Sequence, residues 1–415
     1  MNTVTASLTR LHLRFGPGLL FAAAAVGTSH LVQSTRAGAA YGLTLAGLVI
    51  LVCLLKYPLF RFAADYAAAT GENLVRGYGR QGRALVIVMF LTSAIEAVAA
   101  VAGVSLVTAA LGQWLFGTSV DPVFATGGVL LATAALVAIG RYGVLVSITG
   151  LLVAVFSLLT LTATLSSLPV LANQPSLWPA FTLTRENAAF AIAVSGWMPI
   201  GNTAAMMLAA WILARKQAGG VAAARFDFNL GYGASVLLAL CFLIMGAAVL
   251  HGSATVLPGA SADFVTGFVD LYARTIGDWS TAIVTLAAFA VMYSTLLAIV
   301  DGFPRFLAEF FIELRGGGAD ETAARALYLP ALVVVISGAC IVLAFFMRSF
   351  AAFIDIVTIT GFLAAPIVAW ANGRVVSGSN VPPEHRPGKA LLRWNQFAVV
   401  LLGAATLGFL YLRWF

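Results

Sequence analysis

The chain has 415 residues, of which 61% are apolar and only 9% are charged, and its formal net charge is +7. Soluble proteins carry about 25% charged residues, so the composition excludes a water-soluble globular protein and predicts a polytopic membrane protein. Three cysteines lie inside apolar runs without disulfide or metal-site spacing, and we interpret them as small core residues: Cys53, Cys241 and Cys340.

Hydropathy along the chain predicts eleven membrane spans of roughly the ~20 residues that a helix needs to cross a bilayer. In chain order they lie near 16–36, 43–64, 85–111, 123–140, 144–166, 187–213, 230–250, 280–301, 327–346, 350–371 and 395–413. The first span follows Arg10 and Arg14, as in a signal peptide, but the ten further spans and the lack of a clear cleavage site favour a retained helix.

Lysine and arginine predict the orientation of these spans. With the N-terminus inside, seventeen of the 23 basic residues fall in inside segments and five in outside segments. We therefore expect a cytoplasmic N-terminus and an extracytoplasmic C-terminus in a bacterial inner membrane. The basic residues are spread over separate loops, which argues against a nucleic-acid partner. The expected partners are the lipid bilayer and a transported ion or small solute.

Two predicted spans are interrupted in mid-membrane. The first carries Gly27-Thr28-Ser29-His30, and the second carries Ser195-Gly196-Trp197-Met198-Pro199-Ile200-Gly201-Asn202. An unpaired backbone group in lipid costs several kcal/mol, so a broken helix survives only where it lines a cavity. Breaks at matching places in two halves point to the binding site of a transporter. The sequence therefore predicts a secondary transporter whose substrate lies between the breaks.

The eleven spans divide into two groups of five and one extra helix. We expect a single transmembrane domain with repeat one at about 16–166, repeat two at about 187–371 and the extra helix at about 395–413. An odd number of spans per repeat forces the two halves into opposite orientations, as in inverted-repeat transporters. The predicted fold class is thus an all-α polytopic membrane protein with helices 1 and 6 broken.

The opening residues Gly16-Pro17-Gly18, the pairs Ala37-Gly38 and Tyr41-Gly42, and the two breaks at 27–30 and 195–201 form a pattern that resembles the Nramp family (natural resistance-associated macrophage proteins). That family has an Asp-Pro-Gly-Asn sequence at the first break and Ala-x-x-Met-Pro-His-Asn at the second. The resemblance covers the eleven-span plan. It implies a leucine-transporter-like fold and transport of divalent transition metals with protons.

The chain departs from the family at the residues that carry the chemistry. The family's metal-binding Asp and Asn correspond to Gly27 and His30, and its His after Met-Pro corresponds to Ile200. Of the direct metal ligands, the resemblance carries over Met198 and the carbonyl of Ser195. The chain looks like a divergent Nramp-related branch, to which the metal–proton mechanism does not transfer directly.

Nine residues at or near the breaks are our candidates for substrate binding: Gly27, Thr28, Ser29, His30, Gln33, Ser195, Trp197, Met198 and Tyr293. The imidazole of His30 is suited to metal binding or proton transfer, and a hydrogen bond to a neighbouring helix is the alternative. The thioether of Met198 would select a soft transition metal, and core packing is the alternative. Ser195 would supply an oxygen as the third metal ligand or only cap a helix end.

The other candidates have weaker assignments. Gln33 lies three residues after His30 on one helical face, where it would orient the imidazole or contact substrate. Trp197 and Tyr293 would close the cavity with their rings, or simply pack.

Acidic and basic residues inside spans are functional hypotheses, because a charge at mid-bilayer costs at least about 2.5–3.5 kcal/mol. Glu96, in the middle of span 3, is our candidate for a proton carrier, and a carboxyl that only hydrogen-bonds a neighbouring helix is the alternative. For Asp355 in span 10, an ion pair with Arg348 competes with a functional role. We expect Lys56 and Arg61 to extend to the inner membrane surface.

The leading functional hypothesis is a divalent metal-ion transporter that works by alternating access around the broken helices, with a co-transported proton. Neither break carries a carboxylate, and dehydrating a cation without an anionic partner is unfavourable. The alternative is therefore a transporter of a small organic solute or anion on the same scaffold, since the positive ends of half-helices suit such ligands. A non-transporting sensor is a third class. We expect no cofactor and no enzymatic activity, because the sequence shows no catalytic constellation.

Overall fold

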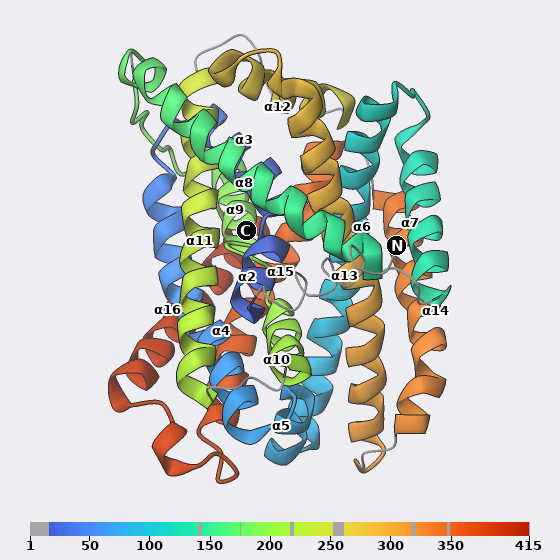
Figure 1. The fold of residues 1–415 in the computed structure, drawn as a ribbon. Helices are drawn as coiled ribbons and strands as arrows, with labels where there is room; N and C mark the ends of the chain where they lie inside the picture. The colour runs from blue at the N-terminus through green and yellow to red at the C-terminus, as the bar shows by residue number, and fades with distance from the viewer. Residues whose placement is uncertain are drawn as a thin grey trace.

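The computed structural model describes residues 16–139, 143–174, 176–215, 220–251, 261–317, 321–346 and 349–414, and within these ranges it contains helices and no strands (Figure 1). Nine helices in this part of the chain are long and apolar enough to cross a membrane. They are α4 (Ala46–Thr70), α6 (Arg83–Phe116), α7 (Pro122–Ile139), α8 (Gly143–Ala172), α11 (Gly220–Val249), α13 (Ser280–Leu314), α14 (Glu321–Phe346), α15 (Phe350–Val376) and α16 (Lys389–Trp414). The predicted all-α polytopic fold class is confirmed.

Several of these helices are longer than the predicted spans. Helix α6 has 34 residues where the sequence predicts 85–111, and α13 has 35 residues where it predicts 280–301. Hydropathy marks only the apolar part of a helix, whereas the backbone hydrogen bonds continue into the polar residues beyond it. Helix α13 therefore runs on as far as Leu314.

Two further segments consist of short helices in series. The first comprises α2 (Pro17–Ala25), a turn at Val26 and Gly27, the π-helix η1 (Ser29–Ser34) and α3 (Thr35–Tyr41). Its interruption is shorter than the predicted 27–30, because the amides of His30 and Leu31 already bond to the carbonyl of Gly27, at 3.1 and 3.0 Å.

The second segment comprises α9 (Arg185–Gly196) and α10 (Ala204–Arg215), with residues 197–203 outside either helix. We predicted an interruption at 195–202, but Ser195 and Gly196 still belong to α9. The hydroxyl of Ser195 donates to the carbonyl of Ala191, at 2.7 Å, within the last turn of that helix.

The interrupted segments lie inside the bundle. Helices α2 and α3 pack on α11, α9 packs on α15, and α10 packs on α4 (Figure 1). Glycines allow the close approach of α3 and α11, because a Cβ atom at Gly38 or Gly246 would overlap the backbone of the facing helix. The core between these elements positions the site described below.

Short helices cover the two ends of the bundle. Helix α12 (Ser261–Ile276) lies at the end that also carries α3, and α5 (Leu74–Gln81) lies at the opposite end (Figure 1). A side-chain cap starts α5, since the Asn73 side chain accepts a hydrogen bond from the amide of Arg76 at 3.0 Å. A short 3₁₀ turn, η2 (Pro383–His385), precedes α16.

Ion pairs join neighbouring helices at each end of the bundle. Near α12, Arg36 of α3 forms two hydrogen bonds to the carboxylate of Asp355 in α15, at 2.6 and 3.1 Å. Near the opposite end, Asp65 of α4 pairs with Arg61 at 3.0 Å and with Arg225 of α11 at 2.8 Å. Asp355 thus has a partner in α3, whereas Arg348, the partner we considered from sequence, lies outside the described residues.

Candidate functional site

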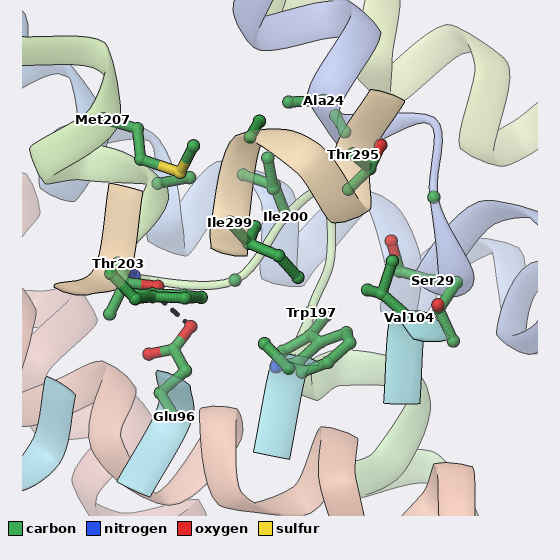
Figure 2. A pocket seen from close by; sticks show the side chains of 18 residues that line it. Ala24, Ser29, Glu96, Val104, Trp197, Ile200, Thr203, Met207, Thr295 and Ile299 are labelled. Carbon is green, nitrogen blue, oxygen red and sulfur yellow. Dashed lines mark hydrogen bonds between the residues drawn. The ribbon is translucent and has the colours of Figure 1, made fainter. Parts of the chain in front are cut away.

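A cavity lies between the two interruptions and helices α6 and α13 (Figure 2). The space in it that is open to the centres of water molecules is about 60 Å³. It is lined by Ala24, Ala25, Gly27, Thr28, Ser29, Glu96, Ala100, Val104, Trp197, Ile200, Gly201, Thr203, Ala204, Met207, Thr295, Ala298, Ile299 and Phe303. One water molecule needs roughly 10–15 Å³ by the same measure, so the cavity has room for a few waters or a small solute.

Helical spacing explains which side chains of α6 and α13 reach this cavity. Glu96, Ala100 and Val104 follow one another at intervals of four residues along α6, so they share one face of that helix. Thr295 and Ile299 share a face of α13 in the same way. The rest of the lining comes from the end of α2, the loop after α9 and the start of α10. Most of these side chains are apolar.

Glu96 is the one acidic side chain among the residues that line the cavity. It is only 3% exposed, and its Oε1 atom accepts a hydrogen bond from the backbone amide of Thr203 at 3.3 Å (Figure 2). Gly201 leaves the space that the carboxyl group occupies, because a Cβ atom there would meet Oε1 at 2.5 Å. The structure therefore places the sequence-predicted proton carrier in the cavity wall, next to the second interruption.

The hydroxyl of Thr28 is buried and has no hydrogen-bond partner in the part of the chain that the structure describes. The same holds for the indole Nε1 of Trp197, which packs beside Gly361 of α15. Leaving a buried polar group unpaired costs about 1–3 kcal/mol. Because Thr28 lines the cavity, a bound ligand that pairs with its hydroxyl would recover part of that free energy.

His30 is fully buried and does not belong to the cavity lining. Its Nε2 atom lies 2.8 Å from the carbonyl oxygen of Ser235 in α11, and its Nδ1 atom lies 3.1 Å from the hydroxyl of Ser29. A carbonyl can only accept, so Nε2 carries a hydrogen, and Nδ1 faces the Ser29 hydroxyl, which also lies 3.4 Å from the carbonyl oxygen of Pro199. Both nitrogens are thereby engaged, which matches the alternative of a histidine bonded to a neighbouring helix.

Four other sequence-predicted residues also lie outside the lining. Met198 is fully buried, and its sulfur is 3.9 Å from the hydroxyl of Ser34. Gln33 donates to the carboxylate of Asp355 at 2.9 Å. The ring of Tyr293 stacks on Phe289, with centroids 5.8 Å apart. The fourth residue is Ser195, whose hydroxyl bonds within α9 as described above.

The structure therefore brings together Gly27, Thr28, Ser29, Trp197 and Glu96, but not the other five candidates. It also adds polar residues that the sequence reasoning missed, namely Thr203 and Thr295. Each has a signal that could have found it: Thr203 directly follows the predicted interruption at 195–202, and Thr295 is a polar residue inside the predicted span 280–301.

Lys56 differs most from its expected position. We predicted that it would extend to the inner membrane surface, yet it is fully buried. Its ammonium donates to the carbonyl oxygens of Ser195 at 3.1 Å and Gly196 at 2.5 Å. These carbonyls end α9 and have no partner within that helix, so they hold the ammonium inside the bundle. Arg61 remains 14% exposed beside Asp65.

Comparisons with known proteins place this geometry on a known scaffold. No protein-family model matches the chain. An uncharacterized protein of Pasteurella multocida (strain Pm70), PM0681, is 29% identical over 406 residues, which cover 95% of this chain and 91% of that protein.

Solved structures share the fold at much lower sequence identity. The manganese transporter of Eremococcus coleocola has a TM-score of 0.69 and 15% identity, covering 98% of this chain and 87% of its own. MhsT in complex with L-phenylalanine has a TM-score of 0.63 and 13% identity, covering 95% of this chain and 98% of its own. The chain is thus an integral multi-pass membrane protein with the leucine-transporter-like fold. The solved structures that share this fold with the chain are those of transporters.

Proposed function

We propose that this protein is a secondary transporter that carries a small organic solute through the cavity between its interrupted segments. The cavity lining carries the proposal, because it combines apolar walls with the carboxyl group of Glu96 and the unpaired hydroxyl of Thr28. Ligand sites are typically apolar concavities with a few placed polar groups. The fold shared with a manganese transporter supports transport as the activity.

The lining favours an organic solute over a divalent metal ion, although the latter is the cargo that the Nramp resemblance implies. Among the described residues there is no group of three or more His, Cys, Asp or Glu that could hold a metal. Glu96 would be the sole anionic ligand in the cavity, and a dehydrated divalent cation needs more compensation than that. His30 and Met198, the predicted metal ligands, lie outside the lining.

The polar groups define the chemistry of the solute. The Thr28 hydroxyl lacks a partner among the described residues and can donate or accept, and the Glu96 carboxyl offers an acceptor when ionised. Apolar side chains such as Ile299 and Phe303 would cover the remaining surface of the ligand. A small, predominantly neutral molecule with one hydrogen-bond donor and one acceptor fits these walls.

Alternating access would use the polar contacts at the ends of the bundle. We place the end with Arg36 and Asp355 outside, as the charge asymmetry predicts, so that this ion pair closes the outer side. The inner path would then run along α10, which leads from the cavity to the end that carries α5 (Figure 1). The interrupted segments, together with α4 and α11 on which they pack, would rock against the remaining helices, and Glu96 would carry a coupling proton.

Ligand-induced stabilisation of the purified protein tests the proposal. Thermal unfolding in detergent would be followed with manganese chloride, magnesium chloride, small amides, amino acids and small carboxylates. A ligand at 100 times its Kd stabilises the folded state by about 2.7 kcal/mol. We expect an organic solute to raise the midpoint, and Thr28→Val to weaken that solute about tenfold, because one hydrogen bond is lost. Stabilisation by manganese alone would support the metal-ion function instead.

A further inference from the structure

The buried Lys56 ammonium occupies a place where a transporter of this architecture can bind a cation. It lies in mid-helix on α4 and touches the last two carbonyls of α9, at the edge of the second interruption. Half-helix ends in the middle of a membrane expose carbonyl groups and the negative end of the helix dipole, and these groups coordinate co-transported cations. In this chain a side chain already supplies the positive charge.

The surroundings of Lys56 contain one further group that favours a positive charge there. Glu96 of α6 lies at the other end of the interruption, where its carboxyl accepts the amide of Thr203, and a negative charge there favours the ammonium. The nearby thiol of Cys53 is buried one helical turn before Lys56 in α4. The ammonium is therefore held by two carbonyl oxygens and the field of one carboxyl group, all inside the protein.

We propose that the Lys56 ammonium is a resident cation: it occupies the cation-binding position formed by the carbonyls at the C-terminal end of α9. This protein therefore binds neither a metal ion nor sodium there. This inference deepens the proposed function, because it removes a metal or sodium ion from the coupling scheme. It predicts that neutralising Lys56 opens a cation site which the natural protein lacks.

The distances give the size of the effect. A metal ion on the Ser195 carbonyl, at about 2.2 Å from the oxygen, would lie within about 5 Å of Nζ, because Nζ itself is 3.1 Å from that oxygen. At an effective dielectric constant of about 20, the repulsion weakens binding about 10²-fold for a monovalent ion and about 10⁵-fold for a divalent ion. Removing the charge should release most of that penalty.

Thermal unfolding in detergent at constant ionic strength tests the inference, with choline chloride as the reference salt. For the natural protein we expect the same midpoint in sodium chloride, manganese chloride and methylammonium chloride. Lys56→Met should lower the midpoint in choline chloride, and millimolar methylammonium or a metal cation should raise it again. Lys56→Gln, whose amide can still donate to the carbonyls, provides a second variant with a smaller initial loss. Lys389→Met, at an exposed lysine, is the matched control and should behave like the natural protein.

Two results would overturn the inference. One is that a particular cation raises the unfolding midpoint of the natural protein, and raises the midpoint of Lys56→Gln by no more than that. The other is a set of Lys56 variants that fold but respond to cations no more than the natural protein does. The solute panel separates this test from that of the proposed function. If no organic solute binds while Lys56→Met gains a cation response, the proposed substrate is wrong and the resident cation stands.

Discussion

In the proposed transporter, the ion pair between Arg36 and Asp355 should keep closed the side that we place outside. Two hydrogen bonds, at 2.6 and 3.1 Å, join α3 to α15, and the two side chains are only 15% and 24% exposed. Gln33 adds a third bond to the same carboxylate at 2.9 Å. Breaking these contacts with Asp355→Asn should favour an outer-open state, because the remaining amide cannot form the bidentate charged pair.

The magnitude follows from the type of contact. Hydrogen bonds to charged groups contribute about 1.5–3 kcal/mol, so the substitution should shift the closed-to-open equilibrium by about 10- to 100-fold. A single cysteine at the cavity, Thr28→Cys, would report this shift in a background without the three native cysteines. We expect a membrane-impermeant thiol reagent added outside to label the cysteine faster, by a similar factor, when Asp355→Asn is present.

A second ion pair provides the matched control. Arg274 and Asp270 pair at 3.1 Å within α12, at the same end of the bundle, but both are about half exposed and neither belongs to an interrupted segment. Exposed pairs contribute about 0–1 kcal/mol, so Asp270→Asn should leave the labelling rate unchanged. Equal labelling rates with and without Asp355→Asn would refute the role of the ion pair in closing the outer side.

Three further predictions concern single side chains. Glu96→Gln should preserve solute binding and abolish the pH dependence of transport into proteoliposomes, because the amide cannot carry a proton. His30→Ala should lower the thermal midpoint even without metal, since the hydrogen bond from the buried imidazole to the carbonyl of Ser235 is lost, at a cost of about 0.5–1.5 kcal/mol. The hydrogen bond from Arg80 lowers the pKa of Glu72. This pair should stabilise the protein at neutral pH and lose its effect as the pH falls from the ordinary carboxyl pKa of 4.5 through the lower folded-state pKa. Arg80→Ala should therefore reduce the loss of stability below about pH 4.5.

Each of these predictions has an outcome that contradicts it. Transport by Glu96→Gln with the natural pH dependence would exclude Glu96 as the proton carrier. An unchanged midpoint for His30→Ala would show that the bridge to α11 is dispensable, whereas loss of manganese binding alone would restore the metal-ligand assignment. Identical pH profiles with and without Arg80→Ala would show that the Glu72 pair is screened by solvent.

Local features of the sequence were sufficient to predict the membrane class and the two stretches of chain that border the cavity. Apolar runs of about 20 residues cross the bilayer as helices. There the lipid surrounds their apolar side chains, and the helix pairs their backbone N–H and C=O groups. The polar and glycine-rich residues at 27–30 and 195–202 stand out against these runs. The structure shortens the first interruption and moves the start of the second, yet both still border the cavity.

Only the tertiary structure decided which side chains face that cavity and which find partners elsewhere. His30 bonds to a carbonyl 205 residues later in the chain, and Lys56 bonds to one 139 residues later. Such partners depend on how the helices rotate and pack, which hydropathy and local motifs do not specify. A histidine at a break therefore became a bridge between helices, and a lysine expected at the membrane surface became a buried cation, because the carbonyls at the end of α9 needed a donor.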